Sequence, residues 1–181
     1  MSVDANHHKL TYEHYCGFAD DGNRHEIIDG DHFAHPAPSL NHQTISRRIE
    51  FQLYSQIELN ELGWVFDAPV DVQLTKYDVV QPDLIVVLKD REKILTESRI
   101  HGTPNLVIEI LSPGTAQNDR TLKKQLYLKT GVPEYWIVDP KTKSIQQYVI
   151  ENDAYVLQPT SEPVVLNILE SVSVDTKLVW K

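Results

Sequence analysis

Two acidic side chains stand in segments that are otherwise apolar. Asp83 lies in QPDLIVV and Glu109 in LVIEILS, both rich in valine, isoleucine and leucine. Burying an unpaired carboxylate costs free energy, so each one needs a cationic partner, a bound metal ion or access to water. Carboxylates on two adjacent strands would suit Mg²⁺, or Mn²⁺ in its place, and would leave room for a phosphate oxygen. The two residues together predict metal-assisted hydrolysis.

Each carboxylate also has a purely structural interpretation. Asp83 follows Pro82 and could cap or end its strand, while Glu109 could pair with a lysine. Polar residues are common at strand ends, so either residue alone is weak evidence. Their occurrence in two apolar strands favours the metal site.

A candidate lysine lies in a predicted helix further along the chain. Asp119, Lys123 and Tyr127 recur every four residues and so fall on one helix face. Lys123 could face the acidic residues, while Lys124 would point about 100° away. A lysine beside a metal-bound water can orient that water and stabilise charge on phosphorus. Spacing alone instead favours an Asp119–Lys123 surface pair worth about 0.3–0.5 kcal/mol.

Further polar residues are candidates for supporting roles. Glu26 stands beside an isoleucine pair and could complete the acidic site or accept a hydrogen bond from its own hairpin. His42 begins a predicted helix and could touch phosphate or metal, although a single histidine there is more often structural. Gln81 and Tyr127 are candidate accessory residues.

Several other classes of protein are excluded by composition and motifs. The chain has no glycine-rich phosphate loop, no His/Cys zinc pattern and no G-x-S-x-G elbow. Its formal charge of −9 argues against a protein that coats nucleic acid, but not against an enzyme that needs carboxylates for metal. Cys16 is the only cysteine, which suits a reducing compartment. No signal peptide or long apolar run is present, so we expect a cytoplasmic protein with no membrane contact.

The elements that position these residues fit one domain. A chain of 181 residues with 41% hydrophobic content can build one core, and we expect a flexible N-terminus at 1–9 and a single domain at 10–181. Apolar spacing and turn residues predict helices from Thr11, over 39–63, over 90–100 and over 112–131. The predicted strands are a hairpin turning at Asp29-Gly30, then 63–74, 77–88, 104–112, 134–140, 144–150, 154–159 and 172–180, the last ones antiparallel.

Five segments of the chain, taken in order, resemble the Uma-two restriction-endonuclease family, a branch of the PD-(D/E)XK nuclease superfamily. The resemblance covers nearly the whole chain, and its last segment is the most specific. The segments are RHEIIDG, APSLNH, QPDLIVV, VIEILSPGT and DRTLKKQLYLKTGVPEYWIVDP.

The resemblance implies a fold and a metal. The fold is an α/β (α+β) restriction-endonuclease-like core, in which a mixed central sheet is flanked by helices and the C-terminal part is rich in β-strands. The metal is Mg²⁺, bound between Asp83 and Glu109.

The chain departs from the superfamily pattern at one position. The motif E-x-K would place a lysine two residues after Glu109, but Leu111 stands there. The family resemblance assigns the catalytic lysine to Lys123, with Glu26 as an additional acidic residue and Tyr127 nearby.

We therefore predict a metal-dependent endonuclease, a hydrolase that cuts DNA. The alternative is a catalytically inactive module of the same fold with a binding or regulatory role, which the acidic balance and the missing E-x-K lysine favour. A weaker alternative is a self-associating structural domain that uses its β-rich C-terminal third. We also expect a homodimer, because proteins of this fold often cut duplexes with paired subunits.

Overall fold

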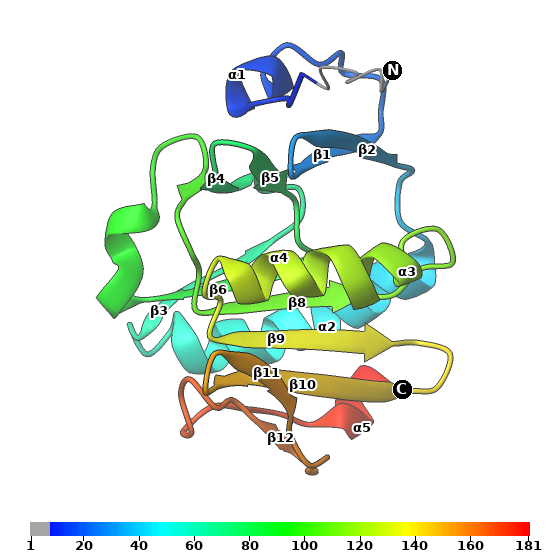
Figure 1. The fold of residues 1–181 in the computed structure, drawn as a ribbon. Coiled ribbons are helices and arrows are strands. Elements are labelled where there is room, and N and C mark those ends of the chain that lie inside the picture. The colour runs from blue at the N-terminus through cyan, green and yellow to red at the C-terminus, as the bar shows by residue number, and fades with distance from the viewer. Residues whose placement is uncertain (1–7) are drawn as a thin grey trace.

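The computed structural model describes residues 8–181, and its central feature is a mixed six-stranded sheet (Figure 1). Strands β8 and β9 are parallel, and every other neighbouring pair in this sheet is antiparallel. In the order β11-β10-β9-β8-β6-β3, its strands are Ala154–Leu157, Ser144–Glu151, Glu134–Asp139, Leu106–Ile110, Leu84–Leu88 and Gly63–Asp67.

A smaller five-stranded sheet carries the N-terminal hairpin. In the order β2-β1-β5-β4-β7, its strands are Asp31–His35, Arg24–Ile28, Asp78–Val80, Val72–Thr75 and Ile100–His101. Strands β12 (Val164–Val165) and β13 (Ser173–Val174) form a separate antiparallel pair. The helices are α1 (Tyr12–Tyr15), α2 (Leu40–Ile57), α3 (Ala116–Asn118), α4 (Lys124–Lys129) and α5 (Thr176–Val179), with a 3-10 helix, η1 (Lys89–Ile94), and a π-helical turn, η2 (Asp119–Lys123).

Helices lie on both faces of the larger sheet, with α2 behind it and α4 in front in Figure 1. Helix α2 begins at the cap Ser39, whose hydroxyl accepts from the His42 N–H at 3.2 Å. Its buried residues recur every four positions and meet Leu84, Val86, Ile108 and Ile110. The opposite face, with Ile85, Val107 and Leu111, packs with α4 and the smaller sheet. The predicted α/β core with helices flanking a mixed sheet is confirmed.

The hairpin prediction is confirmed as well. Asp29 and Gly30 have φ angles of 51° and 85°. Both values lie in the left-handed region, as the two central residues of a type I′ turn require. Thr11 precedes α1 as expected, and Lys9 forms an ion pair with Asp29. Of the predicted flexible stretch 1–9, residues 1–7 lie outside the described part of the chain.

Two predicted strands are wrong because the chain changes sheets at a proline within each of them. The expected strand 77–88 is two strands, β5 and β6, in different sheets, separated at Gln81-Pro82. The expected strand 63–74 divides in the same way at Ala68-Pro69. A proline lacks the N–H that would continue the ladder.

Three helix or strand ends are also corrected. The long helix ends at Ile57 instead of Gly63, since Gly63 is the first residue of β3. The segment 90–100 contains a 3-10 turn and the short β7 in place of a helix. The last predicted strand, 172–180, becomes β13 followed by α5, whose cap Asp175 accepts from the Lys177 N–H at 2.9 Å.

Gly63 tests the account of the α2–β3 connection. A Cβ there would lie 2.4 Å from the Val87 carbonyl oxygen, whereas a Cβ at Gly114 would meet nothing within 4 Å. We expect Gly63→Ala to lower the free energy of unfolding by about 1–3 kcal/mol, because overpacking forces the backbone apart. Gly114→Ala is the matched control and should change it by less than about 0.5 kcal/mol. Equal urea midpoints for the two variants would contradict this packing.

Candidate active site

Asp83 and Glu109 come from neighbouring antiparallel strands of the larger sheet. Leu84 of β6 pairs with Ile108 of β8, so the next step of the same register sets Asp83 opposite Glu109. The Ile110 N–H donates to Asp83 Oδ2 at 2.8 Å and holds this end of the ladder together. Both side chains are buried, at 4% and 3% exposure. The two carboxylates therefore project from the same side of the sheet.

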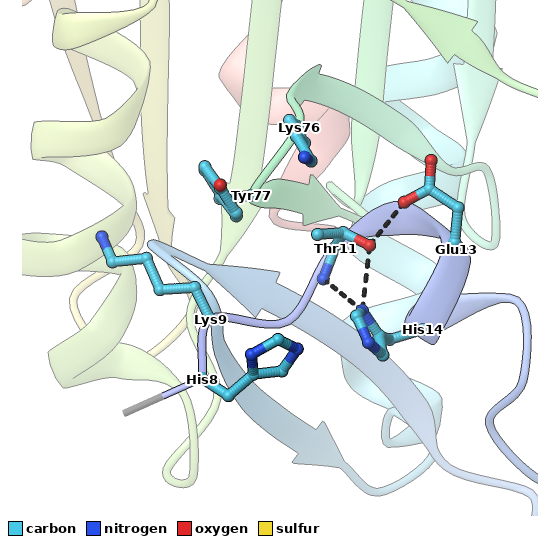
Figure 2. A pocket seen from close by; sticks show the side chains of 7 residues that line it. All are labelled: His8, Lys9, Thr11, Glu13, His14, Lys76 and Tyr77. Carbon is cyan, nitrogen blue, oxygen red and sulfur yellow. Dashed lines mark hydrogen bonds between the residues drawn. The ribbon is translucent and has the colours of Figure 1, made fainter. Parts of the chain in front are cut away.

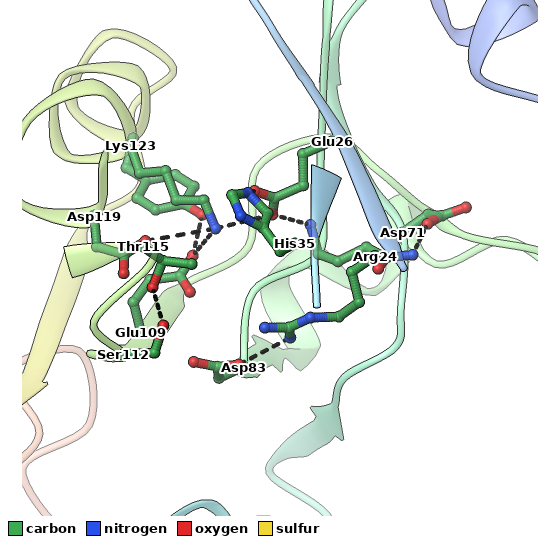
Figure 3. A network of polar contacts seen from close by, with 12 residues as sticks. Arg24, Glu26, His35, Asp71, Asp83, Glu109, Ser112, Thr115, Asp119 and Lys123 are labelled. Atoms are coloured by element: carbon green, nitrogen blue, oxygen red, sulfur yellow. Dashed lines mark hydrogen bonds and ion pairs between the residues drawn. The ribbon is translucent and has the colours of Figure 1, made fainter. Parts of the chain in front are cut away.

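Lys123 enters the same space from the helix that covers this face (Figure 3). Its Nζ lies 3.0 Å from Glu109 Oε1 and 2.9 Å from Glu26 Oε1, and 3.7 Å from Asp119 Oδ1. The Tyr127 hydroxyl donates to Glu109 Oε1 at 2.7 Å. A single ammonium thus joins the hairpin strand β1, the central strand β8 and the helix.

Lys124 points elsewhere. Its Nζ lies 3.6 Å from the centroid of the Tyr148 ring and the residue is half-buried, whereas Lys123 is 4% exposed. The adjacent lysines therefore differ in direction as the helical spacing predicts.

The helix that carries Lys123 is irregular at this point. Residues Asp119–Lys123 form a π-helical turn between α3 and α4, and both its first and last residues are buried. A π-turn widens the helix by one residue and occurs often at functional sites. The π-turn directs Asp119 and Lys123 into the cluster. No residue pattern in the sequence predicts this turn.

Glu26 is held by contacts from three directions. Its Oε1 accepts from the Gln81 N–H at 2.8 Å in addition to meeting Lys123. His35 Nε2 lies 3.2 Å from Glu26 Oε2, close enough for an ion pair but poorly aligned for a hydrogen bond. Gln81 reaches the cluster through its main chain, while its side chain donates to Asp71 and to Tyr15.

Asp83 has two neighbours of its own, an arginine and a histidine. Arg24 Nη1 lies 3.0 Å from Asp83 Oδ1, and His42 Nε2 lies 3.0 Å from Asp83 Oδ2. The sequence interpretation considered His42 but missed Arg24 and His35. A signal was available, because Arg24 and Glu26 alternate along one strand and His35 pairs with Arg24 across the hairpin.

The charges in this cluster do not balance. Four carboxylates, those of Glu26, Asp83, Glu109 and Asp119, surround two permanent cations, Arg24 and Lys123. Burial raises the pKa of Glu109 to about 8 against the opposing effect of Lys123, with Asp119, Asp83 and Glu26 adding to the rise. Burial likewise raises the pKa of Asp119. These two raised pKa values favour the protonated forms of Glu109 and Asp119, where a further positive charge is lacking.

The other two carboxylates are held in the ionised form. Burial pushes the pKa of Glu26 upward, but Lys123 and His35 outweigh it and bring the pKa to about 2. Burial is similarly outweighed at Asp83, whose pKa is lowered by His42 and Arg24. Despite its own burial, Lys123 has a raised pKa because Glu109 and Glu26 surround it.

A divalent cation fits this donor set. It would supply the missing positive charge, and carboxylate oxygens are the ligands that Mg²⁺ prefers. The buried Asp119 Oδ1 has no hydrogen-bond donor, a further sign of incomplete compensation. Within residues 8–181, no three His, Cys, Asp or Glu side chains form a ready metal cage. Asp83 and Glu109 are the residues that could hold such a cation, which would then keep several waters, as Mg²⁺ commonly does.

Two hollows give access to this cluster. One of about 790 Å³ extends from Arg24 and His42 to the loop 112–116 and Arg120. The other, of about 390 Å³, is also lined by Arg24 and His42 and reaches Asp83 itself. Arg24 thus lines both hollows, and the smaller one reaches the Asp83 carboxylate that Arg24 contacts.

A third hollow, of about 660 Å³, lies over α1 and has a different character (Figure 2). Its titratable side chains are exposed, and Thr11 and His14 form the cap of α1 within it. It therefore lacks the buried, perturbed groups that mark a reactive site.

A mixed sheet with helices on both faces and acidic residues on neighbouring central strands is the arrangement expected of a restriction-endonuclease-like protein. The Uma2 family, described as "Putative restriction endonuclease", matches residues 10–178, and this chain belongs to that family. The match supports a nuclease.

Two similar proteins extend this comparison. An uncharacterized protein of Synechocystis sp. is 26% identical over 148 residues, covering 80% of this chain and 76% of its own. The crystal structure of a "putative nuclease belonging to DUF820" from Anabaena variabilis superposes with a TM-score of 0.77 at 19% identity, covering 94% of this chain and 97% of the other. The second likeness establishes the fold. No helix within residues 8–181 is long and apolar enough to cross a membrane.

The raised pKa of Glu109 makes a prediction for the metal-free protein. The carboxyl has a pKa of about 8 in the folded protein, against an ordinary value of 4.5, so the folded state binds an extra proton between these pH values. The contribution of the raised Glu109 pKa to the free energy of unfolding is complete below pH 4.5 and is lost as pH rises to about 8. Relative to Glu109→Gln, the wild-type free energy of unfolding should fall by up to about 1.4 kcal/mol per pH unit across that window. A difference that is constant from pH 5 to 8 would contradict the raised pKa of the buried Glu109 carboxyl.

Proposed function

We propose that this protein is a Mg²⁺-dependent endonuclease that hydrolyses phosphodiester bonds in DNA, with Mn²⁺ able to replace Mg²⁺. The observation that carries the proposal is the Lys123 ammonium, buried 3.0 Å from the carboxylate of Glu109, which stands opposite Asp83 across two strands. Its membership of a nuclease family supports the same conclusion.

Lys123 compensates for the missing E-x-K lysine. The motif position is occupied by Leu111, which packs in the apolar cluster under α4. Lys123 reaches the same carboxylate from the facing helix, with the help of the π-turn that begins at Asp119. An ammonium is equivalent for catalysis whether it comes from strand or helix, provided that it lies beside the reacting phosphate.

Each residue of the cluster then has a role. Asp83 and Glu109 would hold the cation, which lowers the pKa of a bound water and polarises the phosphate. Lys123 orients the attacking water and stabilises the charge that develops on the phosphate oxygens. Glu26 fixes the ammonium from the opposite side, at 2.9 Å, and Tyr127 fixes Glu109 through its hydroxyl, so both act as positioning residues.

A second function is favoured by one specific observation. Both Asp83 oxygens already have protein partners, Arg24 on one and His42 with Ile110 on the other. A catalytically inactive binding or regulatory module would keep such a network without taking up metal. Calorimetric titration with Mg²⁺ or Mn²⁺ in the presence of DNA distinguishes the two functions. The single domain over 10–181 and the homodimer remain predictions.

The first test is cleavage of supercoiled plasmid. Wild-type protein should nick it with Mg²⁺ or Mn²⁺ and not with EDTA. Asp83→Asn and Glu109→Gln should lower the rate by at least about 100-fold, because losing a residue that only orients a metal ligand already costs about 10- to 100-fold in other metal sites. Equal rates for all three proteins would place the activity in a contaminant or at another site. Parallel assays on single-stranded RNA define which nucleic acid is cut.

The lysine pair supplies a second test with a built-in control. Lys123→Ala should abolish cleavage, since no other ammonium in residues 8–181 contacts Glu109, and Lys124→Ala should keep most of it. Lys123→Ala leaves buried carboxylates uncompensated, so its folding is checked by circular dichroism and Lys123→Met is run beside it. Similar rates for the variants at 123 and 124 would refute the assignment of Lys123.

A further inference from the structure

The two oxygens of Asp83 have partners of different kinds. Oδ2 accepts from the Ile110 N–H at 2.8 Å and lies 3.0 Å from His42 Nε2. Both partners belong to packed elements, a central strand and the first turn of α2. Oδ1 instead meets one partner, the guanidinium of Arg24, at 3.0 Å. Oδ1 is therefore the oxygen that an incoming cation can take with least disturbance.

Arg24 is placed to leave that oxygen. It is the first residue of β1, and its side chain is 21% exposed, whereas that of Asp83 is 4% exposed. It lines both hollows that lead to the cluster. Figure 3 shows its guanidinium beside the Asp83 carboxylate, to which a dashed line joins it. A rotation about its long side chain would turn the charge into either hollow without moving the strand.

We propose that Arg24 is a displaceable counter-ion that first neutralises Asp83 in the metal-free protein and then, once a cation has taken Asp83 Oδ1, binds a phosphate of the substrate backbone. The inference rests on the proposed function, because it assigns the cation to Asp83 and a phosphodiester to the hollow. It adds a residue and an order of events that the nuclease assignment does not contain.

Electrostatics favours this exchange. Arg24 and a divalent cation cannot both bind Asp83 Oδ1 closely, since their charges repel one another at short range. A displaced guanidinium would be left beside a polar hollow, and its planar fork suits a phosphate. Arg120, which lines the larger hollow, is by contrast engaged by Asp139 at 3.0 Å and by Gln146 at 2.7 Å. Arg120 therefore provides a matched control on the same hollow.

The proposal predicts opposite effects on two ligands. Arg24→Gln should tighten Mn²⁺ binding by at least about fivefold in calorimetry, because a competitor is removed. The same variant should weaken binding of a short DNA duplex by at least about fivefold when Ca²⁺ replaces Mg²⁺, with a salt dependence reduced by about one ion, and should have little effect in EDTA. Arg120→Gln should leave the Mn²⁺ affinity unchanged.

Contrary outcomes separate this inference from the proposed function. Unchanged or weaker Mn²⁺ binding by folded Arg24→Gln, with wild-type binding and cleavage intact, would overturn the role of Arg24 and leave the nuclease standing. An equal loss of DNA affinity in EDTA and in Ca²⁺ would also overturn it, because Arg24 would then bind phosphate without being displaced. No Mn²⁺ binding by the wild type would overturn both.

A measurement on the wild type tests the displacement of Arg24 even if Arg24→Gln does not fold. In protein labelled with ¹⁵N-arginine, the Arg24 side-chain N–H signal, assigned with Arg24→Lys, should shift on addition of Mg²⁺ by more than the signal of Arg120. A saturating titration that leaves the Arg24 signal in place would overturn the exchange.

Discussion

The architecture of the site depends on one buried ammonium. Lys123 is 4% exposed and lies within 3.0 Å of carboxylates from two different sheets, Glu26 in the hairpin and Glu109 in the central strand. Removing a single buried partner of such a network costs several kcal/mol, because the charges that remain are desolvated and unpaired. The relative positions of the hairpin, the central strand and the helix therefore depend on this one charge. The placement of the acidic residues for the proposed hydrolysis depends on it as well.

Not every buried carboxylate in the protein is of this kind. Glu134 is fully buried, but its oxygens accept from the Trp136 indole, the Gln147 amide and the Ile168 main chain. These neutral donors satisfy it without a cation, and they attach the C-terminal segment to the sheet. The cluster around Lys123 differs because carboxylates outnumber the permanent cations there. A bound metal ion would supply the positive charge that this surplus of carboxylates lacks.

The sequence allowed the site to be predicted further than its surroundings. Acidic residues inside apolar strands are visible in the sequence because their burial is costly, and the positions of Asp83 and Glu109 follow from strand alternation. Family resemblance directed attention to Lys123 and Glu26, which the structure brings within contact of each other. Arg24 and His35 were missed, although the predicted two-residue turn at Asp29-Gly30 already sets the register that pairs them across the hairpin.

The misplaced elements have physical causes of their own. Apolar runs around Pro69 and Pro82 look continuous, and only tertiary pairing reveals that each run changes sheets there. At Asp119–Lys123 the hydrogen bonds follow the π-helical pattern instead of the α-helical one. The residue types there also occur in regular α-helices, so the sequence does not show the change. The end of α2 was missed because Gly63 is a reasonable helix stop, whereas its real role is close approach to the Val87 carbonyl.

In the proposed function, a divalent cation held between Asp83 and Glu109 neutralises the surplus of carboxylates beside Lys123. The most direct test is a crystal structure of the wild-type protein soaked in Mn²⁺, with anomalous diffraction data collected to locate the ion. We expect a peak between the two carboxylates, at about 2.0–2.6 Å from each ligating oxygen, with Lys123 still in contact with Glu109. Saturating Mn²⁺ that gives no peak there, or a peak bound by other residues alone, would contradict it.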